Sequence, residues 1–472
     1  MKTVAIIGGG LTGLTAALDL AAGGRRVTIF EKESEAGGLC RMLPTLAGRD
    51  PVERFYHHLF TSDVDAVRLL GELGLGESLA WIPPKNAFYR HGVSHPFSGP
   101  LDLLRFPPVS PARRLLMGLH ILSARMIRDW SSLEDETAAS WVRRHTGRAV
   151  YNAVWGPLLR AKFGDDADRI SAVWLANKLK LRGSSQKVGA GGECLGYPRG
   201  GFGRIIDKLV QHLASSDANV DLRLSESVEF VEPRNSGGFT VSTSRRGNST
   251  PGNESRSISG SFPGNRYEQS SLPPGSSSRG VYEFDEVLCT LSPSAFADLM
   301  PALPASTRAV WRSIKYQANL CLMLELDRSL SPFYWTSVAD PGFPFVAVIE
   351  HTNLLPVESY GAHIVYISRY LDPADPLFGA SDEVITDVFL EGAGRLFSTF
   401  SEARVLSRRL SRARYAQPVV VPGYGKLVPP LKTPVAGAYL SSMAQIFPED
   451  RGVNYAIRMG RRVARIMVEG SE

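Results

Sequence analysis

Three glycines near the start of the chain have the spacing of a dinucleotide-binding turn. Gly8, Gly10 and Gly13 follow the apolar run 3–7, and Glu31 lies eighteen residues after Gly13. Glycines at this spacing permit a tight turn, a close approach of backbone to pyrophosphate, and close packing of a helix on a strand. A carboxylate placed like that of Glu31 accepts hydrogen bonds from the hydroxyls of an adenosine ribose. The pattern predicts that phosphates bind at the N-terminus of the helix that follows.

The elements that must position these residues are a strand, a helix and a second strand. Residues 3–7 are apolar and β-branched, as a buried parallel strand should be, and residues 27–30 form a second such run. Between them, residues 11–22 place Leu14 and Leu18 on one helical face. This order is typical of a βαβ unit with a right-handed crossover, so we expect an α/β fold with a Rossmann-like domain.

A second glycine pair favours FAD over a nicotinamide cofactor. Gly37 and Gly38 follow Glu31 closely and precede Arg41. This segment resembles the double-glycine motif of the flavin amine oxidase superfamily, which includes protoporphyrinogen oxidases, phytoene-type carotenoid desaturases and UDP-galactopyranose mutases. In that superfamily, a second stretch of backbone and an arginine lie along the FAD. The resemblance implies that Gly37, Gly38 and Arg41 bind this cofactor.

Further segments extend the resemblance along the chain. Residues 196–203 are similar to the P-x-GG segment of carotenoid desaturases. Val228 is similar to the strand valine whose backbone meets the adenine in this superfamily, although it could also be an ordinary strand residue. The run 284–293 is similar to the strand that returns to the FAD domain before a proline.

The C-terminal segment 435–467 occupies the place of the last flavin motif of the superfamily. In that motif a helix start aims its positive end at the pyrimidine edge of the isoalloxazine, where negative charge gathers when the flavin is reduced. The resemblance assigns this task to Gly452, Val453 and Asn454.

The sequence departs from this motif at one pair of residues. The usual Gly-Asp pair reads Gly437-Ala438, so a carboxylate is missing and one ribityl contact is left unassigned. Asp450 or Arg451, close to the helix start, could substitute for that carboxylate. Alternatively, Asp450 is the N-cap of the helix.

Two adjacent histidines lie in the aromatic segment 53–61. His58, with the Leu-Phe that follows it, resembles a segment of UDP-galactopyranose mutases whose histidine lies near the flavin, with Tyr56-His57 in place of Gly-Pro. We therefore interpret His57 and His58 as candidate catalytic residues, for proton transfer or for hydrogen bonding to the substrate. The alternative is that both histidines are structural.

Two cations stand among apolar residues in the segment 155–164. Arg160 or Lys162 could face an anionic substrate or the flavin N5. Long cationic side chains more often lie along a helix surface with their heads in water, and we expect that arrangement here.

Residues 112–130 predict a basic amphipathic helix. Four arginines lie mainly off its apolar stripe, which consists of Leu115, Leu116, Leu119, Leu122, Met126, Ile127 and Trp130. We expect the stripe to pack into the protein. The alternative is that the helix lies on an acidic bilayer.

The remaining pattern indicates two discontinuous domains. Residues 69–181 are mostly helix-like, and residues 245–280 are so rich in Ser, Gly and Pro that we expect a disordered insertion there. The expected FAD-binding domain consists of residues 1–75, 196–300 and 432–472, and the expected mixed helical and β-sheet substrate domain consists of residues 76–195 and 301–431.

Composition excludes several classes of protein. The 472 residues are 43% hydrophobic and 21% charged, which is typical of globular proteins rather than of fibres, disordered chains or multi-span membrane proteins. The four cysteines form no CxxC pair, so we expect neither a disulfide framework nor a metal site. We expect a cytoplasmic protein without a nucleic-acid partner, with peripheral membrane contact as an alternative.

Together these features predict an FAD-dependent oxidoreductase with a small-molecule substrate. The expected chemistry is two-electron oxidation or desaturation of a mostly apolar or aromatic compound, with hydride passing to flavin N5. One alternative is a sugar-nucleotide mutase that uses reduced flavin without net redox change, which the His58 segment motivates. Another is a flavin-bound scaffold without turnover. The electron acceptor stays open between oxygen, a quinone and another carrier.

Overall fold

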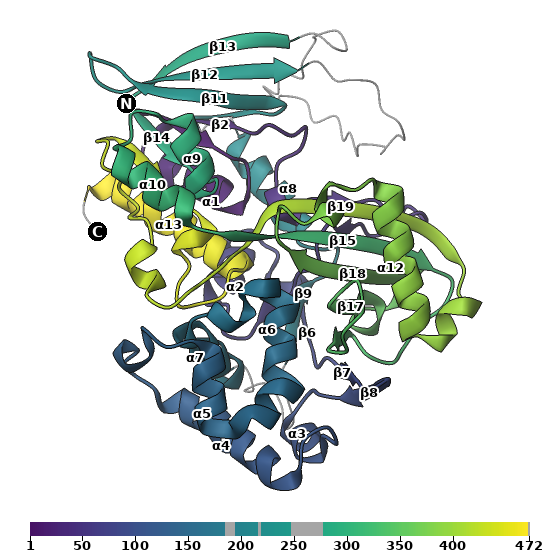
Figure 1. Ribbon diagram of the computed structural model, residues 1–472. Helices are drawn as coiled ribbons and strands as arrows, with labels where there is room; N and C mark the ends of the chain where they lie inside the picture. Colours follow the sequence, from purple (N-terminus) through teal and green to yellow (C-terminus); the bar gives the residue numbers. More distant parts are fainter. Residues whose placement is uncertain (185–193, 216–218, 247–276, 471–472) are drawn as a thin grey trace.

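A five-stranded parallel sheet contains the N-terminal strand. The structure, a computed structural model, describes residues 1–184, 194–215, 219–246 and 277–470 (Figure 1). The strand order is β10-β2-β1-β14-β20, and all four pairings are parallel. The strands are β1 Thr3–Ile7, β2 Arg26–Phe30, β10 Val220–Arg223, β14 Glu286–Cys289 and β20 Ala438–Leu440. Segments far apart in sequence therefore share one sheet, and their carboxyl ends lie at one edge.

Helices cover one face of this sheet, and a second sheet covers the other face. Val4 and Ile29 pack with the helices α1 and α13, whereas Ala5 and Phe30 pack with the antiparallel strands β11, β12 and β13. These elements are α1 Leu11–Ala22, α13 Val453–Glu469, β11 Glu226–Pro233, β12 Phe239–Arg246 and β13 Ser277–Phe284. Both faces of β1 and β2 are buried, which is why these strands are apolar at nearly every position.

A seven-stranded mixed sheet forms the second part of the molecule (Figure 1). Its order is β19-β15-β18-β17-β16-β7-β8, and its β16–β7 pairing is parallel. The strands are β7 Asn86–Arg90, β8 Val93–Pro96, β15 Tyr316–Leu326, β16 Trp335–Val338, β17 Ala347–Glu350, β18 His363–Leu371 and β19 Val405–Pro418. The helix α12 (Asp382–Leu396) covers one face through Phe389. The opposite face, with Met323 and Tyr366, shares a core with α1 and α13.

The helices α3 to α7 gather below these sheets, at the end of the molecule away from β11–β13 in Figure 1. They are α3 Pro100–Arg105, α4 Pro111–Met126, α5 Ala138–Val150, α6 Gly156–Phe163 and α7 Ala172–Ser184. The expectation of a mostly helical stretch over 69–181 is wrong at its start, where β6 (Leu79–Ile82), β7 and β8 occur. β6 pairs with β9 (Leu195–Pro198) and β7 pairs with β16, and such distant partners override local periodicity.

Smaller elements connect these layers. They are β3 Met42–Leu43, β4 Val52–Glu53, β5 Leu59–Phe60, α2 Val64–Glu72, α8 Gly203–Leu213, α9 Pro293–Leu299, α10 Ala305–Ser313 and α11 Pro376–Gly379. The strand β9 pairs with both β5 and β6. It therefore ties the histidine segment to the start of the helical part.

The part of the apolar stripe that lies within α4 faces solvent, so the expectation that it packs into the protein is wrong there; Ile127 and Trp130, beyond the end of α4 at Met126, do pack against the helical core. Leu115, Leu119 and Leu122 are exposed, whereas Met117 and Ala124 on the opposite side are buried. The helix has two apolar sides, and the one with smaller or more flexible residues meets the neighbouring helices. Periodicity identifies the helix but does not reveal which side finds a partner.

Most of the expected insertion 245–280 lies outside the described residues. At its edges, Arg246 pairs with Ser277 across β12 and β13, so the hairpin extends into the segment that we expected to be disordered. The expected domain boundaries stay a prediction. Within the described ranges, no helix is both long enough and apolar enough to cross a bilayer.

Candidate active site

The turn between β1 and α1 leaves the space next to Gly10 open. A Cβ at Gly13 would lie 2.1 Å from the Gly8 carbonyl oxygen, and one at Gly8 would lie 2.4 Å from Thr290 Oγ1, so both positions require glycine for packing. Gly8 also has a φ of +110°. A Cβ at Gly10 would meet nothing closer than the Cα of Gly38, at 3.9 Å. Gly10 therefore faces open space at the uncapped start of α1.

Glu31 fixes this turn from the end of β2. Its Oε2 accepts a hydrogen bond from the Gly9 amide at 2.9 Å, and its Oε1 accepts one from the Glu33 amide at 3.0 Å. The carboxylate is buried. A carboxylate oxygen has room for a second donor, so the expected bond to a ribose hydroxyl stays a prediction that this geometry allows.

The glycine pair Gly37-Gly38 lies directly against the glycine turn that contains Gly8 and Gly10. The Gly37 amide donates to the Gly9 carbonyl oxygen at 2.8 Å, and Gly37 and Gly38 have φ values of +120° and +57°. Arg41 forms an ion pair with Glu33 at 2.9 Å, and its Nε donates to the Gly38 carbonyl oxygen. Arg41 thus holds the glycine pair in place, and a direct bond to the cofactor stays a prediction.

The start of α13 presents free backbone amides. Gly452 is its N-cap, no side chain caps it, and its first turn contains no acidic residue. Val453 and Asn454 are buried, and Asn454 Oδ1 accepts hydrogen bonds from the first turn of α2 at Asp65 and Ala66. Two uncapped helix starts, at α1 and α13, fit the pyrophosphate and the pyrimidine edge of FAD.

The structure does not place Gly437 with these residues. It precedes β20, whose Leu440 aligns with Cys289, and Cys289 aligns with Ile7 at the carboxyl edge of the sheet. Gly437 is therefore at the opposite edge from Gly10, where its φ of +84° makes a turn. Assigning the flavin motif to Gly437-Ala438 is wrong, because resemblance over a few residues does not fix a position along a strand.

The residues that follow β20 at the correct edge are Ser441 and Ser442. Ser441 donates its amide to the Cys289 carbonyl oxygen at 2.9 Å, and the Ser442 amide bonds Gln445. Both serines are buried.

Val228 lies in β11 next to a bulge and packs in the core with Phe30, and its backbone contact with adenine stays a prediction.

His57 lies beside the segment that follows Gly37 and Gly38, and within the electrostatic influence of Arg451. Its ring centroid is 5.8 Å from that of Phe202, and its Nε2 is 3.9 Å from Sγ of Cys40, two residues after Gly38. Burial, with the Arg451 charge nearby, lowers the pKa of His57 to about 4. The imidazole is therefore neutral at pH 7 and can accept a proton or donate one hydrogen bond.

His58 points the other way, toward the seven-stranded sheet. Its Nδ1 lies 3.2 Å from the Tyr334 hydroxyl, and its ring is edge-on to Phe60 and Trp335. Tyr56 lies on the same side, with its ring 5.1 Å from that of Trp335. Successive side chains alternate along an extended backbone, so the rings of the two histidines lie on different sides of the chain.

A cation cluster adjoins the start of α13. The carboxylate of Asp450 accepts hydrogen bonds from Lys162 on α6 and from Lys178 on α7, and both ammonium groups lie 5.0 Å from the ring centroid of Trp174. Because Gly452 is the N-cap, the interpretation of Asp450 as the cap is wrong. The expectation that Lys162 keeps its head in water is also wrong.

The electrostatics of this cluster are positive. Burial would raise the pKa of Asp450, but the two ammonium groups hold that pKa well below its ordinary value, so the carboxylate is ionised. Burial lowers the pKa of Lys162 well below its ordinary value. If Lys162 is uncharged, the two positive charges of Lys178 and Arg451 still exceed the single negative charge of Asp450. The cluster then still has a net positive charge. Arg160 and Arg199, in contrast, are exposed.

Aromatic groups complete the wall around these charges. Arg451 donates to the hydroxyl of Tyr370 on β18. The Nε1 of Trp174 is buried without a hydrogen-bond partner among the described residues, which leaves a donor for a ligand. Neither Tyr370 nor Trp174 carries a recognisable sequence signal, because only the fold brings them to Asp450.

Glu53, at the start of the histidine segment 53–61, has a buried carboxylate that forms several hydrogen bonds. It accepts hydrogen bonds from the Tyr197 hydroxyl at 2.9 Å and from the Phe202 amide at 2.8 Å, while its carbonyl oxygen accepts one from Tyr366. Burial raises the pKa of Glu53 to about 7. Sequence reasoning missed this residue, since a lone Glu in a short strand resembles a surface residue.

The raised pKa of Glu53 makes stability depend on pH. Because the folded pKa lies above the ordinary 4.5, the contribution of this group is fully present below pH 4.5 and is lost as the pH rises to about 7. Glu53→Gln keeps the shape without the charge. We measure the free energy of unfolding of both proteins in urea at pH 5 and at pH 8. The difference in favour of the variant should grow by about 3 kcal/mol from the lower to the higher pH, because only the original chain has a carboxylate to ionise there. An identical pH dependence in both proteins would contradict the assignment.

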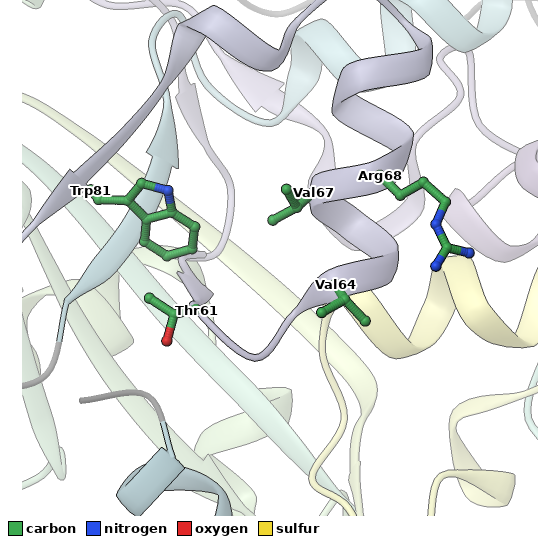
Figure 2. Close-up of a pocket in the computed structure, with 5 residues that line it drawn as sticks. All are labelled: Thr61, Val64, Val67, Arg68 and Trp81. Atoms are coloured by element: carbon green, nitrogen blue, oxygen red, sulfur yellow. The ribbon is translucent and has the colours of Figure 1, made fainter. Parts of the chain in front are cut away.

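A separate surface hollow of about 420 Å³ lies beside β5. Figure 2 shows Thr61 and Trp81 facing Val64 and Val67 of α2 across it, and Arg68 of the same helix also contributes to its lining. Its lining offers one hydroxyl and few other polar groups. It lies outside the two glycine pairs and the cation cluster, so we do not assign the chemistry to it.

Part of the chain is similar in sequence to a curated protein. The mitochondrial protoporphyrinogen oxidase of Nicotiana tabacum is 32% identical over 177 residues, which cover 36% of this chain and 34% of that protein. The match thus spans about a third of the length of this curated relative.

Solved structures match over nearly the whole chain. Cyclohexylamine oxidase from Brevibacterium oxydans IH-35A superposes with a TM-score of 0.70 and 15% identity, covering 99% of both chains. Reduced UDP-galactopyranose mutase superposes with a TM-score of 0.69 and 12% identity, covering 100% of this chain and 94% of that one. At these identities the likeness shows the fold alone, and the expected α/β fold is confirmed.

The family follows from a broader match. A family model described as flavin containing amine oxidoreductase matches residues 11–468. This range includes the glycine pair at Gly37, both histidines and the start of α13. Because the match covers almost the entire sequence, the chain belongs to the family of flavin-containing amine oxidoreductases.

Proposed function

We propose that this enzyme uses FAD to oxidise a mostly apolar or aromatic small molecule that carries an anionic group. The observation that carries the proposal is the positive cluster of Lys162, Lys178 and Arg451 around Asp450. It adjoins the start of α13, where the flavin is expected, and it is lined by aromatic rings. An apolar, aromatic lining with a few placed charges is typical of a small-molecule site.

The charge of the cluster argues against an amine substrate. An aliphatic amine is cationic near neutral pH, and bringing it next to Lys178 and Arg451 would add repulsion in a partly buried site. A carboxylate would instead gain charge-assisted hydrogen bonds from the same groups. The family's name therefore does not fix the substrate class for this chain.

A flavin supplies a two-electron acceptor when it is bound. The substrate would lose a hydride from carbon to that acceptor and a proton to a base. His57, neutral at pH 7 and next to the Gly37-Gly38 segment, is our candidate to accept or relay the proton. Lys162 and Lys178 would hold the anionic group, and Tyr370 and Trp174 would orient the apolar part.

A porphyrinogen is the first candidate substrate. The curated relative from tobacco is a protoporphyrinogen oxidase, and a porphyrinogen combines pyrrole rings with carboxylate side chains. A nucleotide sugar, the substrate class of a mutase, is less favoured. Its two phosphates would need more positive charge than the cluster offers, because Asp450 offsets one of the three cations there and Arg160 and Arg199 face solvent.

The test is substrate-driven bleaching of the flavin under anaerobic conditions. The purified holoenzyme is mixed with a carboxylate-bearing porphyrinogen, its methyl ester, a nonpolar isoprenoid, a primary amine and a nucleotide sugar. We expect the porphyrinogen to bleach the flavin fastest. Bleaching by the amine alone would overturn the proposal. A requirement for prior chemical reduction would favour a mutase, and an unchanged flavin band with every compound would favour a scaffold.

Lys162→Met tests how the anionic group is held. Losing one charge-assisted hydrogen bond should raise the KM for the carboxylate substrate by about 10- to 100-fold and leave the KM for its methyl ester nearly unchanged. Arg160→Met, on the same helix but exposed, is the matched control and should change neither value. Equal effects on acid and ester would contradict a role in binding the carboxylate.

A further inference from the structure

The outward face of α4 is an unusually apolar surface. Leu115, Leu119, Leu122 and Met126 recur at one helical face, and their side chains are between 53% and 81% exposed. We call these four residues the leucine face. On the adjoining α3, Leu101 and Leu104 are exposed as well. Six large apolar side chains exposed on two adjoining helices are typical of a surface that contacts another molecule.

The side of α4 opposite the leucine face packs into the protein. Met117, His120 and Ala124 are buried there. The His120 ring lies 4.2 Å from that of Trp141 on α5. Since the inner side of α4 already has its partners, the leucine face is not a displaced part of the core. It is presented to the surroundings.

Basic residues surround this surface. Arg105, Arg113 and Arg128 are exposed at the ends of α3 and α4, and Asp129 is the nearest exposed acid in the sequence. Arg114 is used differently, because its guanidinium donates to the Leu104 and Val109 carbonyl oxygens and so joins α3 to α4. The surface therefore combines an apolar centre with a positive margin.

We propose that the leucine face and α3 dock on the surface of an anionic lipid bilayer. An amphipathic helix with leucines on one face and arginines at its margins lies in the plane of the interface, with its apolar side among the acyl chains and its cations at the lipid head groups. The same charges disfavour a second copy of this chain, because a symmetric contact would bring two arginine margins together. No helix in the described ranges would span the bilayer, so the contact is peripheral.

Docking would bring the candidate active site close to the membrane. The helix α4 packs on α7, and α7 carries Trp174 and Lys178. Figure 1 shows α3 and α4 at the end of the molecule away from the parallel sheet. If the proposed apolar substrate is correct, the helical wall of its site faces the lipid phase. The docking itself does not depend on that substrate.

Vesicle sedimentation with the FAD-loaded full chain tests the docking. We expect the protein to sediment with vesicles of phosphatidylcholine containing about 30% phosphatidylserine, and much less with pure phosphatidylcholine. Leu115→Gln/Leu119→Gln/Leu122→Gln should weaken binding to the anionic vesicles by roughly tenfold or more. Arg105→Gln/Arg128→Gln should weaken it less and should reduce its sensitivity to salt.

Val310→Gln/Val384→Gln provides the matched control, since both valines are exposed on other helices, α10 and α12. It should bind vesicles like the original chain. All variants should keep their flavin and their melting temperature, because the substituted residues are exposed. Equal vesicle binding by the leucine variant would overturn the proposal. So would the absence of vesicle binding together with a dimer, seen by sedimentation velocity, that the leucine variant abolishes.

Discussion

Gly10→Val should yield a folded protein without flavin. In the structure a Cβ at Gly10 meets no atom closer than 3.9 Å, so the polypeptide itself tolerates a side chain there. The open space lies at the uncapped start of α1, where a pyrophosphate would approach the backbone. A valine would fill that space. We expect the absorbance of bound flavin to be lost and the far-UV circular dichroism to be retained.

Two other glycines separate this effect from general damage. Gly71 in α2 also has no neighbour within 4 Å, so Gly71→Val should keep its flavin. Gly13→Ala places a Cβ 2.1 Å from the Gly8 carbonyl oxygen and should lose the fold and the flavin together. Stoichiometric FAD in the Gly10→Val protein would show that the cofactor does not lie on this turn. The readout is flavin per polypeptide, which does not depend on the identity of the substrate.

Local signals explain which parts of the fold could be predicted. The strand at 3–7 and the helix at 11–22 have the expected bounds, because their apolar spacing, their glycine turn and their burial all act within thirty residues. The family and its FAD could be predicted once Gly37, Gly38 and Arg41, a few residues further on, were added to this pattern. Glu31 is near the glycine turn as expected, yet its bonds to the Gly9 and Glu33 amides became visible only in the structure.

Long-range contacts explain what could not be predicted. Asp450 bonds Lys162 and Lys178, which are more than 270 positions away in the chain. Lysines usually lie at the surface, and no local sequence pattern indicates that these two pair with a buried carboxylate. Gly437 was misplaced for a related reason, since its glycine fits a turn at either edge of a sheet. The outward leucine face of α4 shows the same limit, because periodicity does not reveal which side of a helix is covered.

The two histidines should respond differently to truncation. We expect His57→Ala to lower the rate of substrate-driven flavin reduction by about 10²-fold or more while retaining FAD, the usual effect of losing a positioned proton acceptor. His57 lies against Cys40 and Phe202, beside the segments that we expect to bind the cofactor, and it is neutral at pH 7. His57→Gln, which keeps a hydrogen-bonding group without a titrating ring, should recover part of the affinity for substrate but little of the rate.

His58→Ala is the matched comparison, because the two residues are adjacent in sequence and face opposite sides. The ring of His58 packs edge-on against Phe60 and Trp335, and its Nδ1 lies 3.2 Å from the Tyr334 hydroxyl. Removing it should lower the free energy of unfolding by about 1–3 kcal/mol, through lost packing and an unpaired hydroxyl. The rate of reduction per bound flavin should stay within a few-fold of the original. If His58→Ala instead keeps its stability and loses turnover while His57→Ala does the reverse, the proton acceptor is His58 and the substrate approaches from the seven-stranded sheet.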